Sequence, residues 1–115
     1  EVRRKIANLY IKEIRNLNFD LPELPINESE HVWHLFVIRT KNREKLQKYL
    51  LDIGVQTIVH YPIPPHKQLA YKEFNSFEFP ITEEIHKEVL SLPISPVIQP
   101  EELERIVSML NSFVL

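Results

Sequence analysis

Apolar residues recur close to every three or four positions near the amino end of the chain. Within residues 2–17 these positions alternate with charged ones and are Ile6, Leu9, Tyr10, Ile14 and Leu17. This spacing predicts an amphipathic helix. Residues 18–30 interrupt the pattern with two prolines and several polar residues, which predicts a loop or linker.

The next segments change from a strand pattern to a helix pattern and back. Residues 32–38 are almost continuously apolar and rich in β-branched and aromatic side chains, which predicts a strand covered on both faces. Asn42 and Gly54 suit the N-cap and C-cap of a helix between them. Residues 55–61 return to a β-branched pattern and predict a second strand. Strand, helix and strand within about 30 residues predict a βαβ-like unit.

The carboxyl half of the chain predicts shorter elements and one longer helix. Residues 68–74 suit a short helix, and Thr82 can cap another over residues 83–90. Residues 92–94 suit a brief strand, and Pro100 at a first helical position starts the last helix. The apolar stripe of that helix is Leu103, Ile106, Val107, Leu110 and Phe113 or Val114. Together the patterns predict one α+β domain, with a sheet of two or three strands covered by helices.

Composition excludes several classes of protein. Of the 115 residues, 43% are hydrophobic and 26% charged, and the net charge of −2 predicts no general attraction to nucleic acid or to an acidic membrane. No cysteine is present, which excludes disulfides, thiolate catalysis and cysteine zinc sites. A single glycine cannot build a glycine-rich phosphate loop. No apolar run approaches the roughly 18 residues of a membrane span, so we expect a cytoplasmic protein.

The strongest candidate for chemistry is the segment His-Tyr-Pro-Ile-Pro-Pro-His-Lys-Gln at residues 60–68. Its three prolines predict a stiff loop, and such loops often carry functional side chains. Two histidines six positions apart without a nearby carboxylate make a poor metal site, so no metal ligand is expected. Imidazole groups suit contact with the hydroxyl or phosphate groups of a substrate. The alternative is that these side chains only satisfy backbone groups of the loop.

Other polar and aromatic residues have simpler interpretations. His34, inside an apolar strand, predicts a histidine of the core or an interface, and the tryptophan, Phe36 and the tyrosines predict core aromatics. The paired glutamates at 83–84 and 101–102 open helices, where the helix dipole favours them. Basic residues between positions 39 and 48 suit an exposed helix face, and RNA binding there is the alternative.

Several short motifs, in order along the chain, resemble one family. They are Trp33-His34-Leu35-Phe36-Val37-Ile38-Arg39, Arg43-Glu44-Lys45-Leu46, Gly54, His60-Tyr61-Pro62-Ile63-Pro64, His66, Gln68, Ala70-Tyr71, Phe79-Pro80 and Ser91-Leu92-Pro93-Ile94. The chain resembles the C-terminal region of the DegT/DnrJ/StrS sugar aminotransferases, which are pyridoxal-phosphate enzymes of fold type I. The resemblance covers nearly all of residues 1–115 and implies the small C-terminal domain of that fold.

The resemblance implies transamination of a nucleotide-linked keto sugar, a dTDP- or UDP-keto-deoxyhexose, for polysaccharide or related amino-sugar biosynthesis. Glutamate would be the amino donor, and the parent enzyme would be a homodimer. In this family a larger N-terminal domain carries the lysine that binds pyridoxal phosphate. A chain that begins at Glu1 in a helix reads as a fragment, which we expect to bind no cofactor and to be inactive alone. The alternative is a non-catalytic interaction domain with the same fold.

The resemblance also assigns roles to residues of the proline-rich segment. His60 and Tyr61 match a family segment that faces the sugar, which implies substrate binding, while His66 and Gln68 are expected to organise the loop. No catalytic, cofactor-binding or metal-binding residue is expected in this chain. Residues 1–17 would end an interdomain helix and residues 18–30 would form a linker loop.

Overall fold

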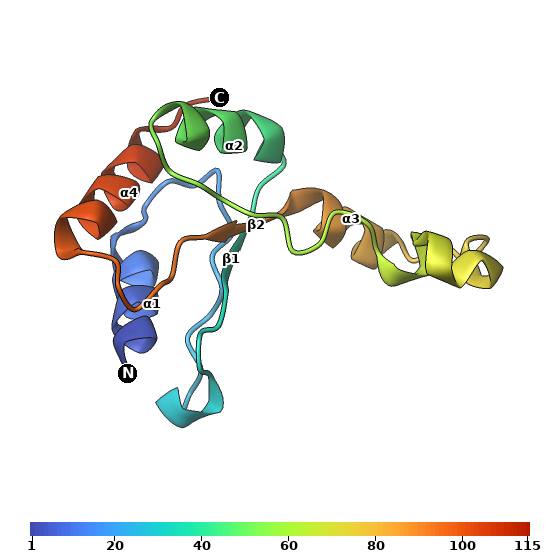
Figure 1. Cartoon of the computed structure of the whole chain (residues 1–115), viewed down its shortest axis with the longest axis horizontal. Coiled ribbons are helices and arrows are strands. Elements are labelled where there is room, and N and C mark those ends of the chain that lie inside the picture. The colour runs from blue at the N-terminus through green and yellow to red at the C-terminus, as the bar shows by residue number, and fades with distance from the viewer.

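The computed structural model describes residues 1–115 and confirms the α+β class. In chain order its elements are α1 (Val2–Glu13), the short 3-10 helix η1 (Glu28–Glu30), β1 (Phe36–Arg39), α2 (Arg43–Asp52), the 3-10 helices η2 (Pro65–Lys67) and η3 (Leu69–Phe74), α3 (Pro80–Glu88), β2 (Val89–Leu92) and α4 (Pro100–Ser112). The two strands form one sheet, and α1, α2 and α4 lie around it (Figure 1). None of the helices combines the length and the apolar character that a membrane span requires.

The sheet is antiparallel, which corrects the predicted βαβ-like unit. β1 pairs with β2, so that Phe36 lies opposite Leu92. Ile58 forms an isolated antiparallel bridge to Ser91 of β2. The segment around Ile58 therefore runs in the same direction as β1, but β2 lies between them. The predicted second strand is reduced to this bridge, because the Thr57 carbonyl accepts from the Gln47 side chain instead and the chain soon reaches prolines, which have no N–H to donate.

Two predicted elements at the amino end are shorter in the structure. The first helix ends at Glu13 instead of residue 17, because the Asn111 side chain accepts from the Arg15 N–H at 2.7 Å and donates to the Glu13 carbonyl at 2.9 Å. Leu17, placed on the predicted stripe, is fully exposed. The first strand begins only at Phe36, because the positive φ of 51° at Trp33 turns the backbone away from an extended course.

Two boundaries in the carboxyl half also shift, and prolines explain both. α3 begins at Pro80 instead of residue 83, since the fixed φ of proline suits the first helical position. β2 spans Val89–Leu92 and ends before Pro93, which has no N–H to continue the ladder. The helix predicted after Asn42 is confirmed as α2, with Asn42 at the N-cap position but without a capping hydrogen bond from its side chain. Gly54 follows the helix with the positive φ of 83° that a C-cap glycine adopts.

One hydrophobic core of 19 buried residues holds α1, α2, α4 and both strands together. Its fully buried members are Tyr10, Phe36, Ile38, Leu46, Leu50, Leu90 and Leu110. The stripe predicted for α4 is confirmed, with Phe113 buried and Val114 exposed. The Tyr10 hydroxyl donates to the Pro93 carbonyl at 2.7 Å, and burial raises the pKa of this phenol.

Residues 61–87 project from this core, and we call them the arm; the rest of the chain is the body. Figure 1 shows the arm leaving to the right through η2 and η3 and returning through α3 to β2. No arm residue belongs to the core, and only Pro64 and His66 within it are buried. The radius of gyration is therefore 15.5 Å, above the about 13 Å expected for a compact domain of this length.

Candidate functional site

His60 lies where the body meets the arm. Two residues earlier, the Ile58 bridge to Ser91 holds the backbone against β2, with the Ser91 N–H donating to the Ile58 carbonyl at 2.8 Å. The His60 Nδ1 lies 2.9 Å from the Ser91 hydroxyl, which fixes the ring and leaves its Nε2 without a partner in the chain. The imidazole therefore has one nitrogen available to an external group.

Tyr61 presents its side chain to solvent. Its ring is 65% exposed and stands edge-on to the His60 ring with centroids 5.4 Å apart. The Tyr61 carbonyl accepts from the Nδ1 of His86 in α3 at 2.6 Å, and this contact ties the start of the arm to its return helix. The phenol has no partner in the chain. Tyr61, and likewise Tyr71, is thus not the core aromatic that its residue type predicted.

His66 lies inside the arm and is only 7% exposed. Its Nε2 donates to the Glu83 carboxylate at 2.9 Å, its carbonyl accepts from the Asn75 side chain at 2.7 Å, and its ring meets Phe79 edge-on. The His66 hydrogen bond, followed by the Phe79 N–H, lowers the pKa of Glu83. Gln68 donates from its side chain to the Ile63 carbonyl at 3.2 Å. Both predicted loop-organising residues therefore make contacts within the arm.

A pocket of about 260 Å³ lies beside His60 at the end of β2. Its polar side chains come from distant parts of the sequence, namely Arg3, His34, Gln56, His60, Ser91 and Ser95. His34 is exposed at this pocket, because the turn at Trp33 buries the tryptophan and leaves the next side chain outside. Of its two predicted places, the core is therefore wrong and the interface stays a prediction. Tyr61, His66 and Gln68 do not line the pocket.

Sequence reasoning missed three residues around these sites. Arg3 lies 57 positions before His60 in a helix predicted only from its apolar stripe. Glu83 was explained by the helix dipole, yet it also accepts the His66 hydrogen bond. The one sequence feature that includes both Glu83 and His86 is the order of charges along α3, with Glu83 in its first turn and His86 in its last.

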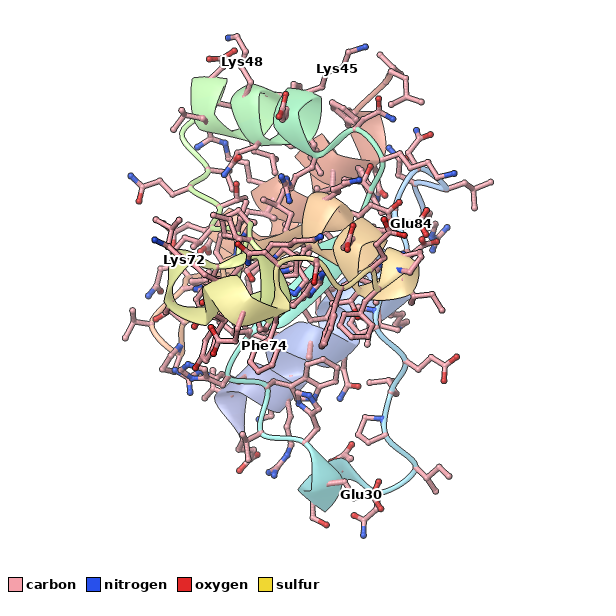
Figure 2. The ribbon with its side chains drawn as sticks, turned by 90° about the vertical axis from the view of Figure 1, so that its right-hand side faces the viewer. Glu30, Lys45, Lys48, Lys72, Phe74 and Glu84 are labelled. Atoms are coloured by element: carbon pink, nitrogen blue, oxygen red, sulfur yellow. The ribbon has the colours of Figure 1, made fainter.

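The basic run between residues 39 and 48 has mostly structural partners. Arg39 ends β1 and pairs with Glu88 at 2.6 Å, and Arg43 donates to the His86 carbonyl at 2.6 Å. Lys45 and Lys48 point outward from α2 (Figure 2), and Lys48 pairs with Asp52 four residues later. This arrangement is typical of an exposed helix face.

The lysines and the glycine of this chain have surroundings that differ from those that usually hold pyridoxal phosphate. Such a cofactor needs a lysine shielded from water and backbone amides that can approach a phosphate. None of the lysines is buried, and Lys67, the least exposed, donates to the Asn75 carbonyl. The single glycine lies at the end of α2. No three His, Asp or Glu side chains are grouped so that they could hold a metal ion.

Comparison with known proteins identifies a family to which this chain is similar. The sequence profile of the DegT/DnrJ/EryC1/StrS aminotransferase family matches residues 1–111. A dTDP-3-amino-3,6-dideoxy-alpha-D-galactopyranose transaminase of Aneurinibacillus thermoaerophilus is 52% identical over 96% of this chain and 30% of its own length. A 3-oxo-glucose-6-phosphate:glutamate aminotransferase of Bacillus subtilis is 36% identical over 88% of this chain and 24% of its own.

Solved structures agree with the sequence relatives. DesV of S. venezuelae, solved in complex with a ketimine intermediate, matches 95% of this chain and 30% of its own with a TM-score of 0.83 and 31% identity. NtdA of Bacillus subtilis, solved with bound cofactor PMP, matches 95% of this chain and 27% of its own with a TM-score of 0.83 and 34% identity. The chain thus spans less than a third of the length of these relatives. The resemblance of its motifs is confirmed, and the chain belongs to the DegT/DnrJ/EryC1/StrS aminotransferase family.

Proposed function

We propose that this chain is the small C-terminal domain of an enzyme that transfers an amino group from glutamate to a nucleotide-linked keto sugar, a dTDP- or UDP-keto-deoxyhexose. The observation that carries the proposal is the 52% identity to a dTDP-amino-sugar transaminase over 111 residues. The chain matches only 30% of that relative. The remainder of the parent enzyme would supply the lysine and phosphate site that this chain lacks.

Within that enzyme, the chain's own residues bind and orient the substrate. The free Nε2 of His60 and the exposed phenol of Tyr61 can each hydrogen-bond to a hydroxyl or phosphate of the sugar nucleotide. Holding the sugar at a fixed angle to the reacting centre lowers the entropic part of the barrier. His66 and Gln68 keep the arm in the shape that places Tyr61. When bound in the parent, pyridoxal phosphate supplies the electron sink for the transfer.

The assembly and location of the parent belong to the same proposal. We place the enzyme in the cytoplasm as a homodimer. Within residues 1–17, α1 would end a helix between its two domains, and residues 18–30 would act as the linker. Sugar-nucleotide transamination supplies amino sugars to polysaccharide or related biosynthesis. The isolated chain is inactive on this proposal, because it has no residues that hold the cofactor.

The experiment is a steady-state assay of the parent enzyme with glutamate and a dTDP-keto-deoxyhexose. Replacing His60 by Ala or Tyr61 by Phe removes one hydrogen bond to the sugar, and kcat/KM falls roughly tenfold. Tyr71→Phe is the matched control, because Tyr71 is also an exposed tyrosine of the arm but its ring lies beside Phe74, whereas the Tyr61 ring lies beside His60. Unaltered kinetics in both variants would remove the substrate-binding assignment. A parent with no transaminase activity on any nucleotide-linked keto sugar would refute the function itself.

A further inference from the structure

Arg3 is held at the pocket beside His60 with most of its hydrogen-bonding capacity unused. Its Nε donates to the Ile94 carbonyl at 3.2 Å, which fastens α1 to the segment that follows β2. Figure 1 shows this segment curving past α1. The two terminal nitrogens of the guanidinium have no partner in the chain, and Arg3 is in no salt bridge. The guanidinium group of Arg3 is therefore held through its Nε, and its two terminal nitrogens are free to donate hydrogen bonds.

Other groups that can donate hydrogen bonds surround the same pocket. His60 is held through Nδ1 by Ser91, and His34 is exposed without a partner. The Ser95 oxygen accepts from the Val97 N–H, which leaves its hydroxyl hydrogen free to donate. An arginine, two imidazoles and a hydroxyl thus face one volume of about 260 Å³.

No carboxylate lines this pocket, which separates it from the other polar hollows of the chain. The hollow at the start of α2 contains Glu44 beside its lysines. The hollow along α3 is lined by four glutamates as well as lysines. In those places the positive charges have internal counter-charges, whereas the charge of Arg3 has none. A site with this balance favours an anionic group with several acceptor oxygens.

We propose that Arg3, together with His34 and His60, forms a binding pocket for one oxyanion group, a phosphate or a carboxylate, of a substrate. The planar fork of arginine matches both groups, because each presents two oxygens to a pair of N–H donors. The volume suits one such group, since whole ligands occupy about 300–1,000 Å³. The preference for an oxyanion rests on the pocket alone. The identity of the molecule that carries the oxyanion rests on the proposed function. The oxyanion is either the diphosphate of the nucleotide sugar or a carboxylate of the amino donor.

The direct test is an NMR titration of the ¹⁵N-labelled chain with inorganic phosphate and, separately, with glutarate. We expect amide shifts confined to the pocket, at residues around Arg3, His34, His60 and Ser95. Arg3→Gln weakens binding about tenfold, because it removes a charge-assisted pair of hydrogen bonds. Arg3→Lys keeps the positive charge but loses the paired N–H groups of the guanidinium. Its affinity for the anion therefore lies between that of the unchanged chain and that of Arg3→Gln. Arg4→Gln is the matched control, since the neighbouring Arg4 donates to the His31 carbonyl and does not line the pocket.

Each result decides the proposal in one direction. A weak anion site is expected to have a Kd of about 1 mM. An unchanged spectrum at about 50 times that anion concentration, or an equal loss of affinity in Arg3→Gln and Arg4→Gln, would overturn the proposal. Circular dichroism of each variant shows whether a loss reflects unfolding. In the parent enzyme, Arg3→Gln raises KM for the nucleotide sugar if the pocket takes the diphosphate, and KM for glutamate if it takes the carboxylate. Binding of phosphate by a parent that is not a transaminase would keep this pocket and refute only the proposed function.

Discussion

The body and the arm are stabilised by different interactions. The body buries 19 core residues in one cluster, and they come from three helices, both strands and the segments that connect them. The arm contributes none of them, and polar contacts, such as that between His66 and Glu83, hold it together. Because burial of apolar surface contributes most of the folding free energy, the body carries the stability of the chain and the arm depends on it.

The difference also appears at the surface. Phe74, Phe77 and Phe79 lie on the arm with 42–50% of their area exposed, and Figure 2 shows Phe74 at the end of the arm that faces the viewer. In the body, Tyr10, Phe36 and Trp33 pack on each other instead. Segments with few buried contacts open at lower free energy than the core. The arm should therefore open locally while the body stays folded.

The largest expected effect comes from the centre of the body. Leu50→Ala empties a fully buried position in α2 and lowers the free energy of unfolding by about 2–5 kcal/mol. Leu51→Ala, at the adjacent position that is 59% exposed, is the control and changes it by less than about 0.5 kcal/mol. Urea unfolding followed by circular dichroism measures both. Equal effects would mean that the core is not centred on this face of α2.

A smaller and local effect is expected from the centre of the arm. His66→Ala removes the hydrogen bond to Glu83 and the edge-on contact with Phe79, so the arm opens more readily by about 1–2 kcal/mol. Native-state hydrogen exchange would show faster exchange of amides in α3, with exchange in α4 unchanged. Lys72→Ala, on an exposed arm residue, is the control. Faster exchange throughout the body would show that arm and body unfold as one unit.

The same contact makes the arm sensitive to acid. Because the pKa of Glu83 is lowered in the folded chain, its stabilising effect is complete above the ordinary glutamate pKa and disappears as the pH falls through the lowered value. Exchange of arm amides should therefore accelerate below about pH 4.5 relative to body amides. In Glu83→Gln this acceleration disappears, whereas Glu84→Gln keeps it. A pH response that persists in Glu83→Gln would assign it to another group.

The smallest effect is expected on the outside of the arm. Phe77→Ser changes the free energy of unfolding by less than about 0.5 kcal/mol, because the ring is half exposed and its aromatic neighbours, Phe74 and Phe79, are themselves exposed. Phe36→Leu in the core serves as the contrast, with a loss above about 1 kcal/mol. Thermal unfolding monitored by circular dichroism compares them. A large loss in Phe77→Ser would show that the arm has a core of its own.

Features that depend on neighbours in the sequence were predicted from the sequence itself. The stripe of α4, the start of α2 after Asn42 and the positive φ of Gly54 follow from side-chain spacing and backbone preferences within a few residues. The α+β class and the family follow from the same local motifs. The proline-rich segment was likewise recognised as a place for polar side chains.

Only the tertiary structure decided which distant residues meet. The insertion of β2 between β1 and Ile58 depends on pairing across more than 30 residues, and no local pattern specifies it. Arg3, His34 and His60 come together because α1 and the end of β2 pack on one core, and His66 meets Glu83 because the arm folds back. Local conformational preference selects helices and turns, whereas long-range burial and strand pairing decide which of them become neighbours. The candidate site depends on this long-range burial and pairing.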